Sequence, residues 1–248
     1  FTLSEQQLEA FRTYADFIGE YGEHTNLVAD TSAGEIFQRH IADSLSILEF
    51  KKLHRPASVS DKKAARLIDL GSGAGFPGLC LAIAICDLKV VLVESVGKKA
   101  RFLREAIERL DLSDRVELFE GRAENLTRHI TGTGMKGGFD IATSRALGHL
   151  ALLAELAMPL LKQGGLSLNY KSESQARSEL KESAKLLKLL GCDHATIFTP
   201  FIQTSSSRHV LIALSKIKGT PSRYPRPWAT MKKEVAGFSF KQDMKTEI

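Results

Sequence analysis

The sequence predicts an α/β protein with a mostly parallel sheet of seven strands, of which the last is antiparallel. From Arg66 onward, short apolar runs alternate with amphipathic patterns of helical period, which is typical of a parallel sheet covered by crossover helices on both faces. The final two apolar runs, near Ala195 and His209, have no helical pattern between them. We therefore expect the last strand to run against the others.

Two amphipathic helices are expected before the first strand. Ser4 and Gln7 have the spacing of a capping box, and the apolar residues of the following stretch, Leu8 among them, recur at helical intervals. A second capping signal begins at Ser32, and the apolar residues after it share one helical face with His40. We expect these helices to form a cap that precedes the sheet.

The strands and helices of the main domain follow in chain order. The expected strands are short apolar runs at 67–70, 90–94, 116–119, 139–143, 166–170, 195–198 and 209–214. The helical patterns between them lie at 78–85, 98–110, 150–161 and 173–190. A polar connection precedes the first strand. The predicted units are an N-terminal helical cap with its linker at 1–63, a main α/β domain at 64–216 and a basic C-terminal tail at 217–248.

The composition is that of a globular protein. The chain has 248 residues, of which 43% are hydrophobic and 25% charged, and its longest apolar stretch, 79–85, is far shorter than the roughly 20 residues that cross a bilayer. The three cysteines form no C-x-x-C pair, which argues against disulfides and a zinc site. The polar, acidic stretch at 5–9 is unlike a secretory signal. We expect a cytoplasmic protein with no metal and no membrane contact.

The positive charge of the chain is concentrated in its C-terminal part. Residues 216–248 contain eight Lys and Arg against three Asp and Glu, whereas the rest of the chain contains 26 of each sign. Clustered bases attract nucleic acids because binding releases counterions from the phosphate backbone. Tyr224 and Trp228 lie among these bases and can stack on unpaired nucleotides, and three prolines favour an extended chain. We expect a flexible RNA-binding arm, with a solubilising tail as the alternative.

The strongest local signal is a glycine-rich loop after the first expected strand. In open parallel sheets, ligands bind beyond the carboxyl ends of the strands. Glycines allow positive φ angles and let a ligand approach the backbone closely. A dinucleotide fingerprint needs its third glycine at position 76, where this chain has Phe76. The pattern Gly71-x-Gly73-x-Gly75 instead resembles that of S-adenosylmethionine-dependent methyltransferases.

Residues at two neighbouring strand ends strengthen this interpretation. Glu94 ends the second expected strand 19 residues after Gly75, and a carboxylate there can accept hydrogen bonds from both ribose hydroxyls of an adenosine. Ala123 and Glu124 follow the third strand at the same edge of the sheet. They can flank an adenine, although an ordinary helix start fits them equally well.

Motifs spread over most of the chain are together similar to those of one family. They run from about residue 8 to residue 226 and include 26–27, 39–45, 69–78, 97–99, 101–103, 121–124, 144–146, Lys171 and 224–226. On these residues the chain resembles the RsmG (GidB) family of bacterial 16S rRNA guanine-N7 methyltransferases. The resemblance implies a class I, Rossmann-like methyltransferase fold with an N-terminal helical cap. It also implies S-adenosylmethionine as cofactor, S-adenosylhomocysteine as product, and 16S rRNA or the small ribosomal subunit as partner of a monomeric enzyme.

The residue pattern and the resemblance together give the expected site residues. By position, the resemblance implies cofactor contacts at Gly71, Phe76, Ala123, Glu124 and Arg145, and the glycine pattern and strand spacing add Gly73, Gly75 and Glu94. Together they form the expected cofactor site. The expected contacts with RNA or with the substrate entrance are His40, Asp43, Lys171, Arg208, His209, Arg223 and Arg226. This chain departs from the family pattern at Ser172, where glycine is usual, and at 227–229, where Pro-Trp-Ala replaces a basic residue, proline and glycine.

The sequence has no pattern of a catalytic triad, and the expected chemistry needs no general base. Guanine N7 carries a lone pair at neutral pH and can attack a sulfonium methyl directly. The enzyme must align the reacting atoms and exclude other nucleophiles. Arg145 follows the fourth strand and is the leading candidate near the transfer point. Its guanidinium can contact guanine O6, the cofactor or a phosphate, or form a structural ion pair.

Three other functions stay open on the residues alone. An NAD-dependent oxidoreductase is disfavoured by Phe76 and by the lack of a Tyr-x-x-x-Lys pair. A noncatalytic RNA-binding protein with a vestigial cofactor site predicts RNA affinity without methyl transfer. A methyltransferase for proteins or small molecules leaves the basic tail without a role.

Overall fold

A single seven-stranded sheet with the order β3-β2-β1-β4-β5-β7-β6 organises the chain. The computed structural model describes residues 2–22, 25, 27–50, 64–132, 138–201 and 209–243, the side chains of 128–132 and 237–243 excepted. Strands β1 to β5 pair in parallel, and β7 is antiparallel to both β5 and β6. This topology confirms the predicted α/β class and the antiparallel last strand.

The strands begin and end close to the predicted positions. They are β1 (Arg66–Leu70), β2 (Lys89–Glu94), β3 (Val116–Glu120), β4 (Phe139–Ser144), β5 (Leu161–Ser172), β6 (Cys192–Phe198) and β7 (His209–Lys216). The largest difference is at β5, which begins at Leu161 rather than at 166. The helix expected over 150–161 stops early because a 3-10 turn, η4 (Met158–Leu160), contains Pro159, which donates no backbone hydrogen bond.

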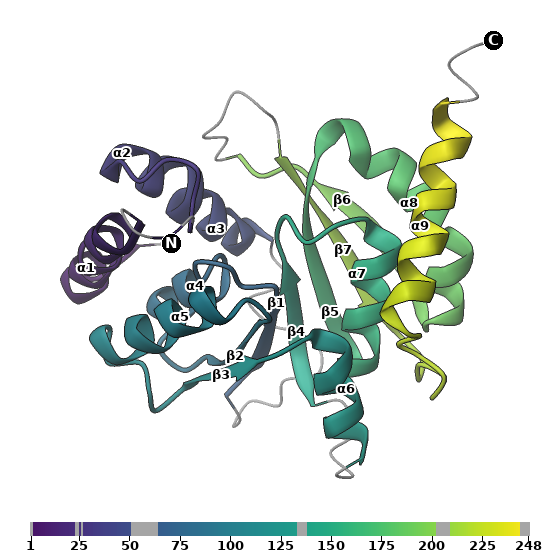
Figure 1. Cartoon of the computed structure of the whole chain (residues 1–248), viewed down its shortest axis with the longest axis horizontal. Helices are drawn as coiled ribbons and strands as arrows, with labels where there is room; N and C mark the ends of the chain where they lie inside the picture. Colours follow the sequence, from purple (N-terminus) through teal and green to yellow (C-terminus); the bar gives the residue numbers. More distant parts are fainter. Residues whose placement is uncertain are drawn as a thin grey trace.

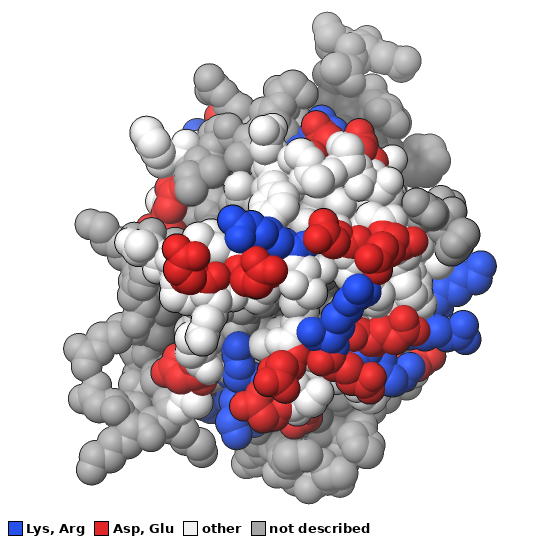
Figure 2. Space-filling view, turned by 90° about the vertical axis from the view of Figure 1, so that its left-hand side faces the viewer, with Lys and Arg blue, Asp and Glu red and all other residues white. Residues whose placement is uncertain are grey.

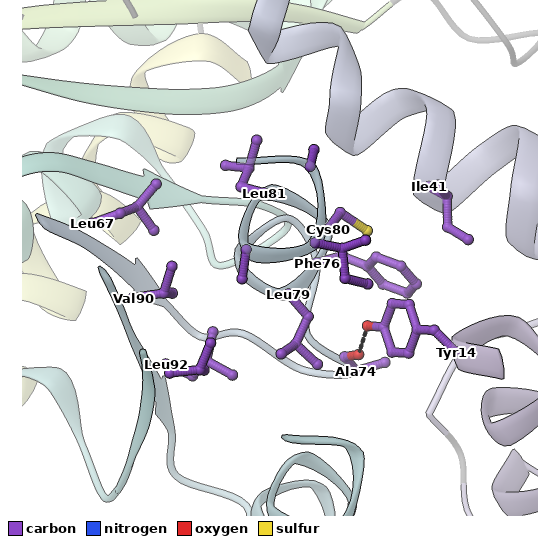
Figure 3. Packing of buried hydrophobic residues seen from close by; sticks show 14 of the residues in the cluster. Tyr14, Ile41, Leu67, Ala74, Phe76, Leu79, Cys80, Leu81, Val90 and Leu92 are labelled. Carbon is purple, nitrogen blue, oxygen red and sulfur yellow. Dashed lines mark hydrogen bonds between the residues drawn. The ribbon is translucent and has the colours of Figure 1, made fainter. Parts of the chain in front are cut away.

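Two hydrophobic cores pack against opposite faces of the sheet (Figure 1). The first is covered by α1 (Glu5–Gly22), α4 (Gly78–Ala84) and α5 (Gly97–Arg109), and the second by α6 (Ala123–Gly132), α7 (Leu150–Ala157) and α8 (Glu173–Leu189). Successive strand residues alternate between the cores, so Leu67 packs with the first and Ile68 with the second. Figure 3 shows part of the first core, where Tyr14 of α1 lies beside Phe76.

The first helix of the cap begins with the predicted capping box. The Gln7 backbone N–H donates to Ser4 Oγ at 3.2 Å, and the Ser4 N–H donates to Gln7 Oε1 at 2.9 Å. Phe11 and Ile18 on this helix are fully buried, as expected. Leu8, expected on the same apolar face, is instead 40% exposed, because the buried face of α1 begins one turn later, at Phe11.

The second helix of the cap is irregular. It consists of α2 (Ala33–Glu35), a π-helical segment η1 (Ile36–Ala42), α3 (Asp43–Leu45) and a 3-10 turn η2 (Ser46–Glu49). The predicted capping box at Ser32 is wrong, because the Ser32 side chain caps no N–H of this helix. Its backbone N–H donates to Asp30 Oδ1 at 2.8 Å, so an Asx turn leads into the helix. Short π-helical segments are frequent at functional sites.

The C-terminal part packs against the body, which corrects the expectation of an extended arm. Residues 221–227 are non-helical as expected, but the helix α9 (Trp228–Asp243) follows directly. Tyr224 is buried in the second core, and Arg226 Nη2 lies 2.7 Å from Glu155 Oε2 on α7. A buried ring and an ion pair therefore fix this stretch beside α7, where Figure 1 shows α9 along the outer side of the molecule.

The surface formed by α1 and its neighbours carries mixed charge. In Figure 2 acidic and basic side chains lie side by side on this face, with no extended basic patch among the described residues in view. None of the helices in the described ranges is both long and apolar enough to span a bilayer. The three cysteines, Cys80, Cys86 and Cys192, are free thiols. The division into units at 63 and 216 stays a prediction.

Candidate functional site

The glycine-rich loop turns sharply from β1 into α4. The backbone N–H groups of Gly71 and Ser72 both donate to the carbonyl oxygen of Val93 on β2, at 2.9 and 3.0 Å. Gly71, Gly73 and Gly75 have φ angles of 70°, 59° and 96°, in the region that favours glycine. These hydrogen bonds and angles hold the loop at the carboxyl edge of the sheet, where the sequence predicts the ligand site.

The N-terminal cap supports this loop from outside. Tyr14 on α1 is fully buried and donates a hydrogen bond to the carbonyl oxygen of Ala74, drawn as the dashed line in Figure 3. A Cβ atom added at Gly75 would lie 2.6 Å from both Tyr14 Oη and Leu79 Cδ1. Gly75 therefore permits the close packing of α1 on the loop. The role of Tyr14 is not predicted from the sequence, because nothing in its helical pattern distinguishes it from an ordinary core residue.

Asp69, at the base of the loop, holds three segments together. Its Oδ2 accepts from the Gly78 N–H at 3.1 Å, and its Oδ1 accepts from the Thr143 hydroxyl at 2.7 Å. The carboxyl group is fully buried, and this burial raises the pKa of Asp69 to about 6 although the hydrogen bonds oppose the rise. Asp69 thus fixes the start of α4 relative to β1 and β4.

Glu94, the predicted ribose ligand, lies at the end of β2 beside the loop. Its Oε2 accepts from the Gly73 N–H at 2.9 Å and its Oε1 accepts from the Val96 N–H at 2.7 Å. The side chain is only 6% exposed but borders a cavity. Each carboxylate oxygen has a second lone pair, so Glu94 can accept further hydrogen bonds from a ligand while it holds Gly73 in place.

Two adjoining cavities lie along the loop. The larger, of about 440 Å³, is lined by Leu27, Val28, His40, Gly71, Ser72, Gly73, Ala74, Phe76, Glu94, Ser95, Val96, Lys99, Arg145, Ala146 and Leu147. The smaller, of about 190 Å³, is lined by Gly71, Val93, Ser95, Gly121, Arg122, Ala123, Glu124, Leu147, Leu156 and Trp228. They share the wall formed by Gly71, Ser95 and Leu147. Except for Gly75, which packs behind the loop, the structure thus brings the predicted cofactor residues to one continuous depression.

Two aromatic rings form the cap-side wall of the larger cavity. His40 on η1 stacks on Phe76, with ring centroids 4.9 Å apart and planes at 19°. Burial, together with the nearby guanidinium groups of Arg145 and Arg39, lowers the pKa of His40 to about 4. His40 is therefore a neutral, ring-stacking residue at pH 7 rather than a cation that binds phosphate.

Arg145 lies where the cap meets the sheet. Its Nη2 is 2.7 Å from the carbonyl oxygen of Arg39 and 2.9 Å from Asp43 Oδ2, and its Nη1 donates to the carbonyl oxygen of His40 at 3.4 Å. The contact with Asp43 is an ion pair without hydrogen-bond geometry, so Asp43 Oδ2 has no hydrogen-bond partner among the described residues. The next residue, Ala146, has a φ of 54°, a strained conformation for a residue with a Cβ.

A third cavity, of about 560 Å³, opens on the other side of Arg145. It is lined by Arg145, Ala146, Gly148, His149, Tyr170, Lys171, Ser172, Gln175, Glu179, His209 and Val235. Arg145 and Ala146 belong to both this cavity and the 440 Å³ cavity. Arg145 and the strained Ala146 therefore form the boundary between the depression at the glycine loop and the larger 560 Å³ cavity.

Lys171 is not placed to bind a phosphate in the way that the sequence analysis expects. Its side chain is 8% exposed, and its Nζ lies 2.8 Å from Glu179 Oε2 and donates to the carbonyl oxygen of Gly148. Glu179 also accepts from the Leu150 N–H at 2.6 Å. Lys171 therefore fixes the floor of the 560 Å³ cavity by joining β5, α8 and the start of α7.

The remaining predicted RNA contacts are scattered. His209 borders the 560 Å³ cavity, whereas the exposed Arg223 lies with its guanidinium 5.3 Å from the Tyr224 ring. Arg226 pairs with Glu155, and these hydrogen bonds raise the pKa of its guanidinium further. Arg208 lies outside the described residues. The site residues that sequence reasoning missed are those whose partners come from distant elements, above all Tyr170, whose hydroxyl donates to the carbonyl oxygen of Ser44 at 2.8 Å.

The side chains and backbone groups that line the site are suited to positioning ligands. The described residues contain no group of three or more His, Cys, Asp and Glu that can hold a metal ion. The groups that converge at the boundary are a guanidinium, a neutral imidazole, aromatic rings and backbone of the glycine loop. Such an arrangement can position two ligands against one another and exclude water between them.

Comparisons with known proteins agree on one family. Residues 7–211 match the GidB family model, described as rRNA small subunit methyltransferase G. The chain is 38% identical over 90% of its length to the ribosomal RNA small subunit methyltransferase G of Lachnoclostridium phytofermentans, of which it covers 87%. It is 36% identical to the protein of the same name from Geobacillus thermodenitrificans, over 94% of this chain and 92% of that protein.

Solved structures support the fold. The N-terminal domain of human METTL16 in complex with SAH aligns with 71% of this chain and 70% of that chain, at 15% identity and a TM-score of 0.54. The cofactor-bound Rv0187 from MTB aligns with 87% of this chain and 92% of that chain, at 17% identity and a TM-score of 0.50.

Proposed function

The chain belongs to the rRNA small subunit methyltransferase G (GidB) family, and from this membership we propose that it transfers a methyl group from S-adenosylmethionine to N7 of a guanosine in 16S rRNA. The observation that carries the proposal is the meeting of two cavities at Arg145 and Ala146. One cavity lies on the glycine loop and the other lies over β5 and α8. This arrangement suits a cofactor and an acceptor base that react across a common boundary.

The residues of the glycine loop fit S-adenosylmethionine. The larger loop cavity has the Glu94 carboxylate for the ribose hydroxyls and exposed backbone of Gly73, where an added Cβ would have only Gly71 O, at 3.9 Å, within contact distance. Phe76 and His40 supply an aromatic wall, and the smaller adjoining cavity extends toward Ala123. Gly71 must stay small because an added Cβ would lie 2.5 Å from Leu147.

When bound, the cofactor supplies a methyl group on a positively charged sulfur, so that the guanine N7 lone pair forms the new N–C bond while the C–S bond breaks and leaves its electron pair on the sulfur of S-adenosylhomocysteine. The residues of this chain have to align the two ligands rather than move a proton. Arg145 is held by the cap and lies at the boundary, where its guanidinium can donate to guanine O6. The His40–Phe76 pair covers the loop side and keeps water out.

The 560 Å³ cavity is the proposed site for the guanine base. Tyr170 and His149 supply flat surfaces or hydrogen-bonding groups there, and Lys171 with Glu179 forms a rigid floor. The exposed bases Lys232 and Lys233 lie on α9, which contributes Val235 to the same cavity. We propose that phosphates of the RNA approach along this helix. The same proposal places a monomeric enzyme in the cytoplasm with its ribosomal substrate, and sedimentation tests the monomer.

The test is transfer of labelled methyl from S-adenosylmethionine to 16S rRNA, offered both naked and in small subunits that lack the modification. Nucleoside analysis of the product is expected to give labelled 7-methylguanosine from a single position. Glu94→Ala is expected to reduce incorporation strongly, whereas Glu120→Gln, a change of the half-exposed carboxylate at the end of the neighbouring strand, is expected to leave it unchanged. Cofactor binding without methyl incorporation into either RNA form would exclude 16S rRNA as the acceptor.

A further inference from the structure

The smaller loop cavity has one wall that comes from outside the parallel part of the sheet. Most of its lining belongs to the ends of β1, β2 and β3 and the loops that follow them, but Trp228 comes from the first position of α9. Val93, Leu147 and Leu156 give the cavity an apolar interior. It adjoins the cavity that contains Glu94, so a ligand whose ribose lies at Glu94 can extend its base into this space.

Trp228 contacts Arg122 through its ring, and residues before and after it in the chain are anchored to the body. The Arg122 guanidinium lies 5.6 Å from the centroid of the indole ring, within the range of a cation–π contact. The residues around Trp228 in the chain are anchored independently, since Arg226 pairs with Glu155 and Met231 is 1% exposed. The ring is therefore positioned before any ligand binds, which lowers the entropic cost of using it as a contact.

We propose that Trp228, oriented by Arg122, is an adenine-contacting residue that sets the cofactor affinity of this chain. The inference rests on the proposed function and deepens it. A flat indole beside an apolar slot suits stacking or edge contact with a purine, and such aromatic contacts add affinity beyond the buried area.

The experiment uses the fact that Trp228 is the only tryptophan of the chain. Titration of the full-length protein with S-adenosylhomocysteine is expected to change the tryptophan emission in a saturable way. Adenosine is expected to produce the same change at higher concentration, and methionine is expected to produce none. An emission that responds to methionine but not to adenosine would place Trp228 at the wrong end of the ligand and overturn the proposal.

Calorimetry measures affinity independently of the fluorescence. Trp228→Ala is expected to weaken S-adenosylhomocysteine binding about tenfold and Trp228→Phe about twofold, because phenylalanine keeps an aromatic face. Arg122→Ala is expected to weaken S-adenosylhomocysteine binding less than Trp228→Ala does. If Arg122 acts through the ring, the double variant is expected to bind no more weakly than Trp228→Ala alone. Thr230→Ala, an exposed change on the same helix at a residue that lines none of the cavities described above, is the control and is expected to keep the wild-type affinity.

The outcomes separate this inference from the proposed function. If the wild type binds S-adenosylhomocysteine but Trp228→Ala binds it equally well, the role of Trp228 is excluded while the methyltransferase assignment stands. If the wild type binds no S-adenosylhomocysteine, the cofactor assignment itself fails. Thermal unfolding of each variant shows whether a lost affinity comes from lost folding, and Trp228→Phe provides a folded comparison if Trp228→Ala is unstable.

Discussion

Asp43 of the N-terminal cap lies 2.9 Å from Arg145 at the end of β4, measured from Oδ2 to Nη2. The two side chains are 10% and 16% exposed. Burial raises the pKa of Asp43, although Arg145 and His209 oppose this rise. The ion pair thus joins the cap to the boundary between the two proposed ligand cavities, and its loss is expected to affect both folding and methyl transfer.

Arg145→Met is expected to lower the free energy of unfolding by about 3 kcal/mol, because it leaves the Asp43 carboxylate buried without a partner. Urea unfolding at pH 7.5 measures this change. The double variant Asp43→Leu with Arg145→Met is expected to recover much of the loss, since it removes both charges. Additive effects of the two single changes would show that the side chains are not coupled. Arg145→Lys keeps the charge and is expected to lose methyl transfer at least about tenfold, with a smaller loss of stability.

His40 makes the stability of the protein depend on pH. Its pKa is lowered to about 4 in the folded state, below the ordinary 6.5, so the unfolded state binds its proton first. The stabilisation is fully present above pH 6.5 and is lost as the pH falls toward 4. When the pH is lowered from 7.5 to 5.0, the free energy of unfolding of the wild type is expected to fall by on the order of 1 kcal/mol more than that of His40→Phe. This figure allows for solvent screening of a partly exposed ring.

The comparison with His40→Phe isolates this one group. Asp69, whose pKa is raised to about 6, acts in the opposite direction over the same pH range but is present in both proteins. Phenylalanine at position 40 keeps the ring contact with Phe76. Urea midpoints at the two pH values give the difference, and equal losses in the two proteins would show that His40 is not desolvated in the folded state.

Glu94→Gln is expected to weaken S-adenosylmethionine binding about tenfold, which corresponds to 1.4 kcal/mol. Glutamine keeps one carbonyl oxygen but replaces the other acceptor by an NH2 group, which faces either the Gly73 N–H or the Val96 N–H. Calorimetry with the intact protein measures the affinity. An unchanged affinity would place the ribose away from this carboxylate. Glu120→Gln serves as the matched change at the end of β3.

Lys171→Met is expected to reduce stability by about 3 kcal/mol without a change in the salt dependence of RNA binding. The ammonium is buried against Glu179, so its removal leaves a buried carboxylate rather than a lost phosphate contact. Filter binding at several salt concentrations gives the slope that reports phosphate contacts. If Lys171→Met lowers the salt-dependence slope of RNA binding by about one charge, Lys171 contacts an RNA phosphate after all.

Two neighbouring sets of basic side chains in the C-terminal part are expected to differ in their effects on stability and on RNA binding. Arg226→Ala is expected to destabilise the protein by about 3 kcal/mol, because Glu155, 1% exposed, loses its ion-pair partner. The exposed pair Lys232→Ala with Lys233→Ala is expected to leave stability within about 0.5 kcal/mol. The lysine variant is expected to reduce the salt slope of RNA binding, and a normal slope would remove α9 from the RNA path.

The sequence was sufficient to predict the elements that depend on local pattern. The glycine loop and the strand ends that carry Glu94 and Arg145 follow from alternation and spacing, because the carboxyl ends of parallel strands lie at one edge. The antiparallel last strand follows from the missing helix before it. What the pattern does not contain is which polar side chains neutralise each other once the chain is folded.

Lys171 and Arg226 illustrate this limit. Each was expected to contact RNA, and each is instead paired with a carboxylate on another element, Glu179 on α8 and Glu155 on α7. The partner of Arg226 is 71 residues away, so no local spacing signals the pair. Trp228 is a similar case, because its position beside Arg122 depends on the packing of α9 against the body.

The place of β7 has a consequence for synthesis of the protein. This last strand lies between β5 and β6 and is hydrogen-bonded to both. It is the neighbour of β5 on that side and the observed partner of β6. In a nascent chain whose β7 is still inside the ribosome, β5 lacks its neighbour on that side and β6 lacks its observed partner, and unpaired strand edges readily pair with other chains. Truncated products that end within β7 are expected to aggregate, and the 560 Å³ cavity, which is lined in part by His209 on β7 and Val235 on α9, forms only after both elements have emerged.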